Sequence, residues 1–258
     1  MPRFAANLSM MFTEHAFPDR FEAAAAAGFE AVEFLFPYEY PARDIAARRV
    51  GAGLEQALFN LPPGDWARGE RGLAALPERK AEFRQSVRTA LDYAAVIGAP
   101  RLHMMAGLAD PGRSPHRAAY RDSLAFAADA AAERGVEVLI EPINGRDMPG
   151  YFLHDFDYAA DLIADLGREN IKLQFDIYHR QILCGDVIRG LEDLLPIIGH
   201  VQIASVPHRN EPGLGELDDF RVLRALDDLG YQGFVGCEYR PSGATLDGLG
   251  WMSKVSRV

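Results

Sequence analysis

The chain has few cysteines, few positive charges and no long apolar run in its 258 residues. Its two cysteines, Cys184 and Cys237, exclude the disulfide framework of a small secreted domain. The net charge of -10 argues against a nucleic-acid surface, which needs clustered lysine and arginine. No run reaches the length of about 18 apolar residues that predicts a membrane span, and the amino end does not resemble a secretory signal. We therefore expect a cytoplasmic protein that binds neither nucleic acid nor membrane.

Short apolar runs alternate with longer alanine- and leucine-rich segments, a pattern typical of βα units and a parallel sheet. Eight runs are predicted strands: residues 4–8, 31–36, 54–60, 101–105, 136–141, 172–176, 200–204 and 234–238. The clearest predicted helices are residues 20–27, 81–97, 118–134 and 220–229. A chain of 258 residues suits a single barrel of this kind. The sequence thus predicts an α/β fold, a (β/α)8 TIM barrel that forms one domain over residues 1–258.

An open, doubly wound sheet is the alternative architecture. Such a sheet favours a glycine-rich phosphate-binding loop after its first strand, but residues 7–11 (NLSMM) contain no glycine. Glycines instead follow the helical segments, where Gly98 and Gly167 are placed to end helices in a left-handed conformation. The pattern therefore favours the closed barrel.

Polar residues end four consecutive predicted strands: Glu141, Asp176, Gln202 and Glu238. Since the carboxyl ends of barrel strands share one rim, we expect these three carboxylates and one amide to converge. Carboxylates that lie close together repel unless a cation neutralises them, and oxygen ligands suit Mg²⁺ or Mn²⁺ better than zinc. One acidic strand end is more often a helix cap or an ion-pair partner, but four adjacent ends predict a divalent metal site.

Several motifs carry a resemblance to known proteins. Residues 141–144 (EPIN), 176–179 (DIYH) and 209–215 (RNEPGLG) resemble the xylose-isomerase-like barrel superfamily of sugar isomerases and epimerases. Residues 6–10 (ANLSM), 34–38 (FLFPY), 60–66 (NLPPGDW) and 69–72 (GERG) are similar to the hydroxypyruvate isomerase family. The resemblance covers nearly the whole chain, and the second group of motifs is the more specific of the two.

The resemblance implies the interconversion of hydroxypyruvate and tartronate semialdehyde without an organic cofactor. A related branch of the family acts on four-carbon 2-oxo-tetronates, and the choice between the two substrates stays open. The four strand-end residues would bind the metal, Glu141 and Glu238 would also move the proton, and His179 and Arg209 would contact substrate. Gln202 departs from the wider epimerase pattern, which usually has histidine there.

Moving a carbonyl to the neighbouring carbon requires removal of one proton and return of another through an enediolate. A bound metal stabilises the developing negative oxygen as a Lewis acid. Glu141 and Glu238 then serve as acid and base, in an order that the sequence does not fix. Arg209 is the first candidate to pair with the carboxylate of a small hydroxy-carbonyl acid, because its planar guanidinium matches two carboxylate oxygens.

Further residues are expected around this site. Asn7, His208 and Arg71 are expected to contact substrate, Arg71 from a loop that could cover the site, although a solvated loop arginine is about equally expected. Asn144 and Asp147 are expected to orient the metal ligands. His103 is expected to be a hydrogen-bonded core residue rather than a ligand.

Three other functions remain open. A zinc-dependent phosphoesterase or abasic-site nuclease could use the same barrel, but it usually gathers several histidines, and none of the seven here occupies a ligand position. A dehydratase could use the same metal and base to eliminate water. A non-catalytic sugar-acid sensor would bind without proton exchange, against which the pair Glu141 and Glu238 argues. Barrels of this kind often pair through their helices, so a homo-oligomer is an expectation.

Overall fold

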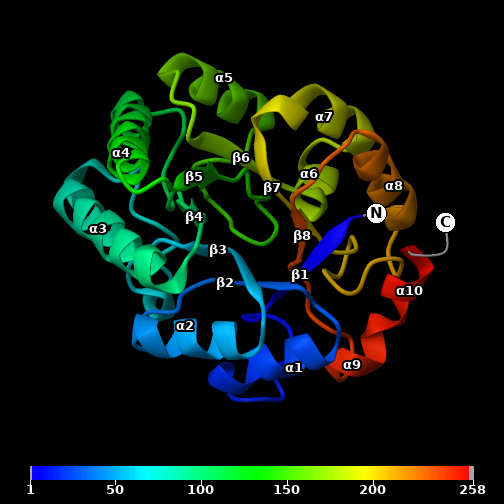
Figure 1. Cartoon of the computed structure of the whole chain (residues 1–258). Coiled ribbons are helices and arrows are strands. Elements are labelled where there is room, and N and C mark those ends of the chain that lie inside the picture. The colour runs from blue at the N-terminus through cyan, green and yellow to red at the C-terminus, as the bar shows by residue number, and fades with distance from the viewer. Residues whose placement is uncertain (1, 256–258) are drawn as a thin grey trace. The chain divides into compact units, whose positions relative to one another are not determined.

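The computed structural model describes residues 2–255 of the chain. Its strands are β1 (Arg3–Asn7), β2 (Ala31–Phe34), β3 (Glu55–Asn60), β4 (Arg101–His103), β5 (Glu137–Ile140), β6 (Ile171–Asp176), β7 (Ile198–Ile203) and β8 (Phe234–Cys237). These strands are hydrogen-bonded in chain order into a closed barrel, in which β1 pairs in parallel with both β2 and β8 (Figure 1). The predicted α/β TIM barrel is confirmed.

The helices follow the strands along the chain. They are α1 (Arg20–Ala26), α2 (Ala42–Gly51), α3 (Lys80–Ile97), α4 (Ser114–Ala132), α5 (Phe156–Leu166), α6 (Ile177–Leu183), α7 (Val187–Leu194), α8 (Asp219–Asp228), α9 (Thr245–Gly248) and α10 (Met252–Val255). Within residues 2–255, none of them is both long enough and apolar enough to cross a membrane.

Element ends differ from the sequence prediction by a few residues. The strand β2 ends at Phe34 and β4 ends at His103, two residues earlier than predicted, whereas β7 begins two residues earlier, at Ile198. The helix α4 begins at Ser114, four residues before its predicted start. Proline suits the first helical turn, where its missing N–H has no helical partner, so Pro115 belongs inside α4. The predicted left-handed helix ends at Gly98 and Gly167 are confirmed.

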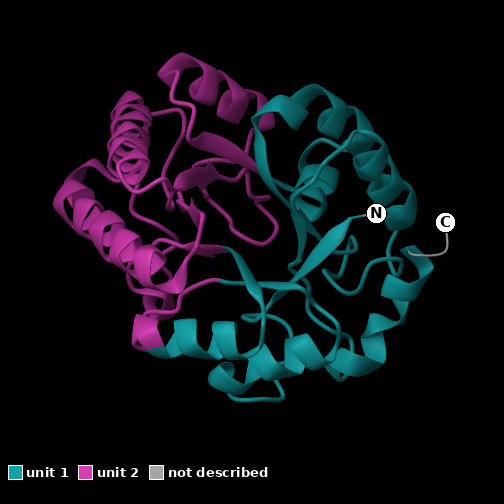
Figure 2. Ribbon diagram, in the orientation of Figure 1, with its two compact units in different colours: residues 1–34, 44–57, 175–258 teal, residues 35–43, 58–174 magenta. Residues whose placement is uncertain are grey.

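The contacts divide the chain into two compact units (Figure 2). Unit 1 comprises residues 1–34, 44–57 and 175–258, and unit 2 comprises residues 35–43 and 58–174. The strands β3 and β6 begin in one unit and end in the other. The expectation of a single domain stays a prediction.

Each unit has its own buried core. In unit 1, Ala5, Ala31 and Ala57 surround Phe234, so small side chains from β1, β2 and β3 leave room for one aromatic ring from β8. In unit 2, α3 and α4 pack side by side, and α4 also packs against β5 (Figure 1). These elements are long in sequence and buried on one face, which is where periodicity predicts helices best.

Candidate active site

A set of buried polar side chains lies on the strands of unit 1. Side chains alternate between the two faces of a strand, so residues two apart share a face. Glu33 lies two residues after the core residue Ala31, and Asn7 is its register partner on β1. In the same way Glu238 follows the core residue Phe234 by four positions. The strand face that carries the buried apolar residues Ala31 and Phe234 therefore carries polar side chains closer to the carboxyl ends of the strands.

Gln202 and Glu33 are directly bonded in this set. The Gln202 Nε2 donates to Glu33 Oε1 at 2.7 Å, and both side chains are buried. His200 Nε2 lies 2.7 Å from Glu33 Oε2. The sequence analysis missed Glu33 and His200, because neither ends a strand. A charged residue between Val32 and Phe34 was the signal that could have identified Glu33.

Asp176 ends β6 and begins α6. Its Oδ1 accepts a hydrogen bond from the backbone N–H of Tyr178 at 2.8 Å, which caps the helix. Its Oδ2 lies 3.6 Å from His179 Nε2 and 3.5 Å from Arg209 Nη2. The expected metal ligand Asp176 and the expected substrate contacts His179 and Arg209 are therefore brought together within unit 1.

Arg209 also contacts the end of β8. Its Nη2 lies 2.7 Å from Glu238 Oε2. The backbone of Arg209 is left-handed, with φ of 58°, a conformation that costs a non-glycine residue roughly 1 kcal/mol or more. Two backbone hydrogen bonds hold it there, one to Ser205 and one from Arg240. The neighbouring His208 is exposed, so of these two expected substrate contacts the structure buries only Arg209.

Burial makes two carboxyl groups of this site, Asp176 and Glu238, less favourable as anions. It raises the pKa of the Asp176 carboxyl, although the Arg209 charge opposes the shift. It also raises the pKa of Glu238, again against Arg209. A further cation would favour the charged forms of both groups. The donor set of buried carboxylates and an amide therefore fits a hard divalent metal ion, which prefers oxygen ligands.

Glu141 follows β5 in unit 2 and is buried there. Its Oε2 lies 3.6 Å from Nε2 of the buried His103. The charge of Glu141 also raises the pKa of Tyr151, after the larger effect of that tyrosine's burial. His103 is thus a core residue, as expected, and in addition a neighbour of the expected proton-transfer residue.

The loop after Glu141 is folded on itself. Asn144 is buried, and its Oδ1 accepts the backbone N–H groups of Arg146 and Asp147 at 2.9 Å each. Its Nδ2 donates to Asp147 Oδ2 at 3.1 Å. Asp147 is exposed. The two residues shape this loop, and their expected role toward the metal ligands stays a prediction.

Arg71 lies on an aromatic ring in unit 2. Its Cζ is 3.8 Å from the centroid of the Trp66 ring, and the Trp66 ring packs at a tilt against Phe36, with 5.0 Å between the ring centroids. The Arg71 guanidinium also donates to the backbone carbonyls of Trp66 and Glu70. A guanidinium that is bound in this way is oriented, so Arg71 is more than a freely solvated charge. Its contact with substrate stays a prediction.

The buried Asp219 holds the loop between β7 and α8 by hydrogen bonds. Asp219 Oδ2 accepts the backbone N–H of Gly213 at 2.6 Å and the Ser205 hydroxyl at 3.4 Å. Its Oδ1 is buried and has no hydrogen-bond partner among residues 2–255. Burial raises the pKa of Asp219 to about 6. The loop that carries Arg209 thus depends on a carboxyl group whose charged form is only partly stabilised.

This gives a prediction for stability against pH. A carboxyl whose pKa is raised on folding binds its proton more tightly when folded, so it stabilises the fold at low pH. That contribution is lost as the pH rises from about 4 through 6. The free energy of unfolding of Asp219→Asn, relative to the natural protein, should therefore rise by about 2 kcal/mol between pH 4 and pH 7.

Urea unfolding of both proteins across this range measures the effect. Asp228→Asn, which changes an exposed acid of the same helix, is the matched control and should show no such trend. A difference between Asp219→Asn and the natural protein that stays constant with pH would show that Asp219 does not titrate in this window.

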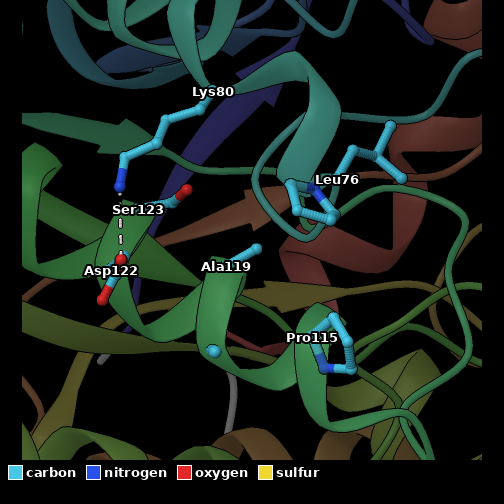
Figure 3. A pocket seen from close by; sticks show the side chains of 8 residues that line it. Leu76, Lys80, Pro115, Ala119, Asp122 and Ser123 are labelled. Carbon is cyan, nitrogen blue, oxygen red and sulfur yellow. Dashed lines mark hydrogen bonds and ion pairs between the residues drawn. The ribbon is translucent and has the colours of Figure 1, made fainter.

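A cavity of about 280 Å³ lies elsewhere in unit 2, beside α3 and α4 (Figure 3). Leu76, Pro115 and Ala119 line it, together with Lys80 and Asp122, whose side chains form an ion pair of 3.3 Å. None of the expected site residues lines this cavity. It therefore has no part in the chemistry considered below.

Comparison with known proteins agrees with the barrel and its motifs. The family model for xylose isomerase-like TIM barrels matches residues 21–255. A 2-oxo-tetronate isomerase from Cupriavidus necator is 59% identical, with 98% of each chain covered. A hydroxypyruvate isomerase from Escherichia coli is 42% identical, again with 98% of each chain covered. These relatives are isomerases, as the sequence predicted for this chain.

Solved structures agree as well. The structure of an AP endonuclease, family 2, from Brucella melitensis is 47% identical, with a TM-score of 0.95 over 98% of this chain and 99% of that one. A 3-keto-D-glucoside 4-epimerase from Escherichia coli has a TM-score of 0.79 over 98% of this chain and 99% of that one. At 23% identity the epimerase supports the fold alone. The chain belongs to the xylose isomerase-like TIM barrel family.

Proposed function

We propose that this protein is a metal-dependent isomerase that moves a carbonyl group to the neighbouring carbon of a small hydroxy-carbonyl acid. The observation that carries the proposal is the buried group around Arg209, whose Nη2 lies 2.7 Å from Glu238 and 3.5 Å from Asp176. Carboxylates and a guanidinium at this burial would supply both metal ligands and a partner for a substrate carboxylate.

Asp176, Gln202 and Glu238 would hold the metal, together with Glu141 from the end of β5. Carboxyl ends of barrel strands form the active-site rim in enzymes of this fold, which supports the inclusion of Glu141. A bound Mg²⁺ or Mn²⁺ would supply Lewis-acid stabilisation to the negative oxygen of an enediolate. No organic cofactor is needed for this chemistry.

Glu238 and Glu141 would transfer the protons. One removes the proton from the hydroxyl-bearing carbon, and the other delivers a proton to the former carbonyl carbon. The hydroxyl proton moves from the oxygen of the first carbon to the oxygen of the second, so that carbonyl and hydroxyl exchange places. Burial raises the pKa of Glu238, which brings its proton affinity closer to that of a useful acid or base at neutral pH. Two separate groups imply that the delivered proton originates from solvent.

Arg209 would bind the substrate carboxylate, and His179 would donate to a substrate oxygen. The left-handed backbone of Arg209 and the contact of its Cζ with the Tyr178 ring, at 5.0 Å, hold the guanidinium in one orientation. His179 follows Asp176 by three residues on α6, so it is fixed by the same helix start. We expect Asn7 and Arg71 to contact the substrate in addition to Arg209 and His179.

We propose a 2-oxo-tetronate as the substrate to test first. The relative with that name is 59% identical, compared with 42% for the hydroxypyruvate isomerase. Hydroxypyruvate is the second candidate, because the same bonds change in a three-carbon acid. The four-carbon acid carries one more hydroxymethyl group, which a hydrophobic pocket distinguishes by only about 1–3 kcal/mol. A cytoplasmic location is part of the proposal.

A nuclease is the less supported alternative. One solved relative is called an AP endonuclease, but the expected metal ligands of unit 1, Asp176, Gln202 and Glu238, are two buried carboxyl groups and a buried amide. Zinc-dependent hydrolysis usually draws on histidine ligands. His179 lies close to Asp176, so one histidine could join, whereas the strand-end positions themselves are occupied by oxygen donors.

Product analysis by NMR tests the proposal. With added Mg²⁺ or Mn²⁺, the protein should convert a 2-oxo-tetronate into its carbonyl-shifted isomer, with hydroxypyruvate converted more slowly. A ratio of kcat/KM that favours hydroxypyruvate would keep the chemistry and reverse the choice of substrate. A dehydrated product would show a dehydratase, and cleavage of an abasic-site oligonucleotide without any isomer would show a nuclease.

A further inference from the structure

We propose that Glu33 is a positioning residue, which orients the Gln202 amide and, through Asn7, the Glu238 carboxylate for metal binding. The inference rests on the proposed function, in which Gln202 and Glu238 are metal ligands. Glu33 itself would touch neither metal nor substrate.

The Glu33 carboxylate is built into the barrel interior. Its side chain has 0% exposure, and its strand neighbour on β1 is Asn7. A Cβ added at Gly236 on β8 would overlap the carboxylate. The glycine therefore leaves the space that the Glu33 carboxylate occupies, and any side chain at position 236 would displace the carboxylate.

Three side-chain nitrogens surround this carboxylate. Gln202 Nε2 and Asn7 Nδ2 donate to Oε1 at 2.7 and 3.0 Å. His200 Nε2 lies 2.7 Å from Oε2, and His200 Nδ1 is buried without a hydrogen-bond partner among residues 2–255. The His200 tautomer with its proton on Nε2 fits this arrangement, because Nε2 then donates to Glu33 and the unpartnered Nδ1 carries no proton. Glu33 thus acts as an acceptor toward all three.

The bond to Gln202 selects the orientation of the amide. A carboxylate can only accept, so it bonds the NH₂ end of the amide and repels the oxygen end. Because Glu33 holds the Gln202 Nε2, the other terminal atom of the amide, Gln202 Oε1, is the one that would bind a metal. A rotated amide would direct a nitrogen at the metal, and a protonated amide nitrogen is no ligand. Glu33 therefore decides which atom Gln202 presents.

A second link runs through Asn7. Its Nδ2 donates to Glu33 Oε1 at 3.0 Å and lies 3.4 Å from Glu238 Oε1. The other oxygen of Glu238 is bonded by Arg209. Glu238 is thus fixed through both oxygens, and Glu33 anchors the Asn7 amide that fixes one of them. Partners that orient metal ligands in this way typically change metal affinity or activity by about 10–100-fold when replaced.

A set of four proteins tests the inference: the natural protein, Glu33→Gln, Gln202→Glu and the double variant. Mn²⁺ affinity is measured by electron paramagnetic resonance on metal-free protein, and kcat and KM are measured separately. Glu33→Gln should weaken Mn²⁺ binding at least about 10-fold and lower kcat more than it raises KM. In the double variant the amide introduced at position 33 can donate to the carboxylate introduced at position 202, which restores that bond with its polarity reversed, while the link to Asn7 is lost because its Nδ2 then faces a donor. The Mn²⁺ affinity of the double variant should therefore be less than about 10-fold weaker than that of Gln202→Glu alone.

Glu55→Gln is the matched control, because it removes the same charge from an exposed position at the start of β3. It should change neither Mn²⁺ affinity nor kcat. If Glu33→Gln does not fold, as judged by near-ultraviolet circular dichroism, the double variant conserves charge and its comparison with Gln202→Glu decides. A loss of about 10-fold or more in that comparison would overturn the inference.

The outcomes separate this inference from the proposed function. If the natural protein binds Mn²⁺ and turns over, and folded Glu33→Gln keeps both properties, Glu33 is no positioning residue and the proposed function stands. If the natural protein neither binds Mn²⁺ nor turns over, the proposed function fails, and the inference fails with it.

Discussion

Glu238→Gln is expected to lower kcat/KM for the isomerisation by about 10³-fold or more, while the protein stays folded. The amide keeps the shape of the carboxyl group but cannot accept a proton, and general acid–base catalysis typically contributes about 10²–10⁴-fold. The loss should fall mainly on kcat, because Arg209 and His179 still bind the substrate. Steady-state kinetics with saturating Mn²⁺ measures it.

The raised pKa of Glu238 indicates that the Glu238→Gln variant should remain stably folded. Burial raises that pKa, so the proton is held more tightly in the folded protein, and the stabilising contribution is present at low pH and lost as the pH rises through the raised value. Burial raises this pKa to about 8. Above that value the natural carboxylate is a buried charge, so metal-free Glu238→Gln should melt at the same or a higher temperature at about pH 9.5. A lower Tm in the variant would mean that Arg209 compensates the charge fully, and the loss of activity could then reflect misfolding.

Removal of the metal is expected to have an effect of similar size. Protein that has been treated with a chelator and dialysed should lose at least about 10³-fold of its activity, because the enediolate oxygen loses several kcal/mol of stabilisation. Added Mg²⁺ or Mn²⁺ should restore it. Asp176→Asn should behave like the metal-free protein at moderate Mn²⁺ concentration, since it removes one anionic ligand.

An exposed acid provides the comparison for this variant. Asp186→Asn changes a residue that lies ten positions later in the chain, before α7. It should leave activity and its Mn²⁺ dependence unchanged. Full activity of the chelator-treated protein, with no metal detected by mass spectrometry, would contradict the metal-dependent mechanism.

The sequence predicted the barrel because each strand leaves a local signal. Apolar runs such as that before Asp176 are short and bounded by polar residues, and α3 and α4 are long with one buried face. The helix α2 gave little signal, because Ile45 is its only buried residue among many charged ones. Its position is determined by the strands on either side, which periodicity does not report.

The candidate site was predicted as far as strand ends reveal it. Asp176 and Glu238 could be found because each follows directly on an apolar run, and Gln202 because it is a polar residue near the carboxyl end of one. The charge of Glu33 within an apolar run is visible in the sequence, but its role is not, because that role depends on Gln202 and His200, which lie more than 160 residues away in sequence. The sequence favoured Arg209 over His208 for the substrate carboxylate by its chemistry, but it did not report that Arg209 is buried and His208 is exposed.

Deuterium incorporation from D₂O tests the central claim most directly. The metal-loaded protein is incubated with a 2-oxo-tetronate or hydroxypyruvate, and the product is examined by NMR. Transfer through two separate glutamates predicts solvent deuterium at the former carbonyl carbon in nearly every product molecule, dependent on the metal and absent in Glu238→Gln. Product that carries only substrate hydrogen at that carbon would contradict the two-glutamate transfer, and absence of any product or exchange with both acids would contradict the isomerase itself.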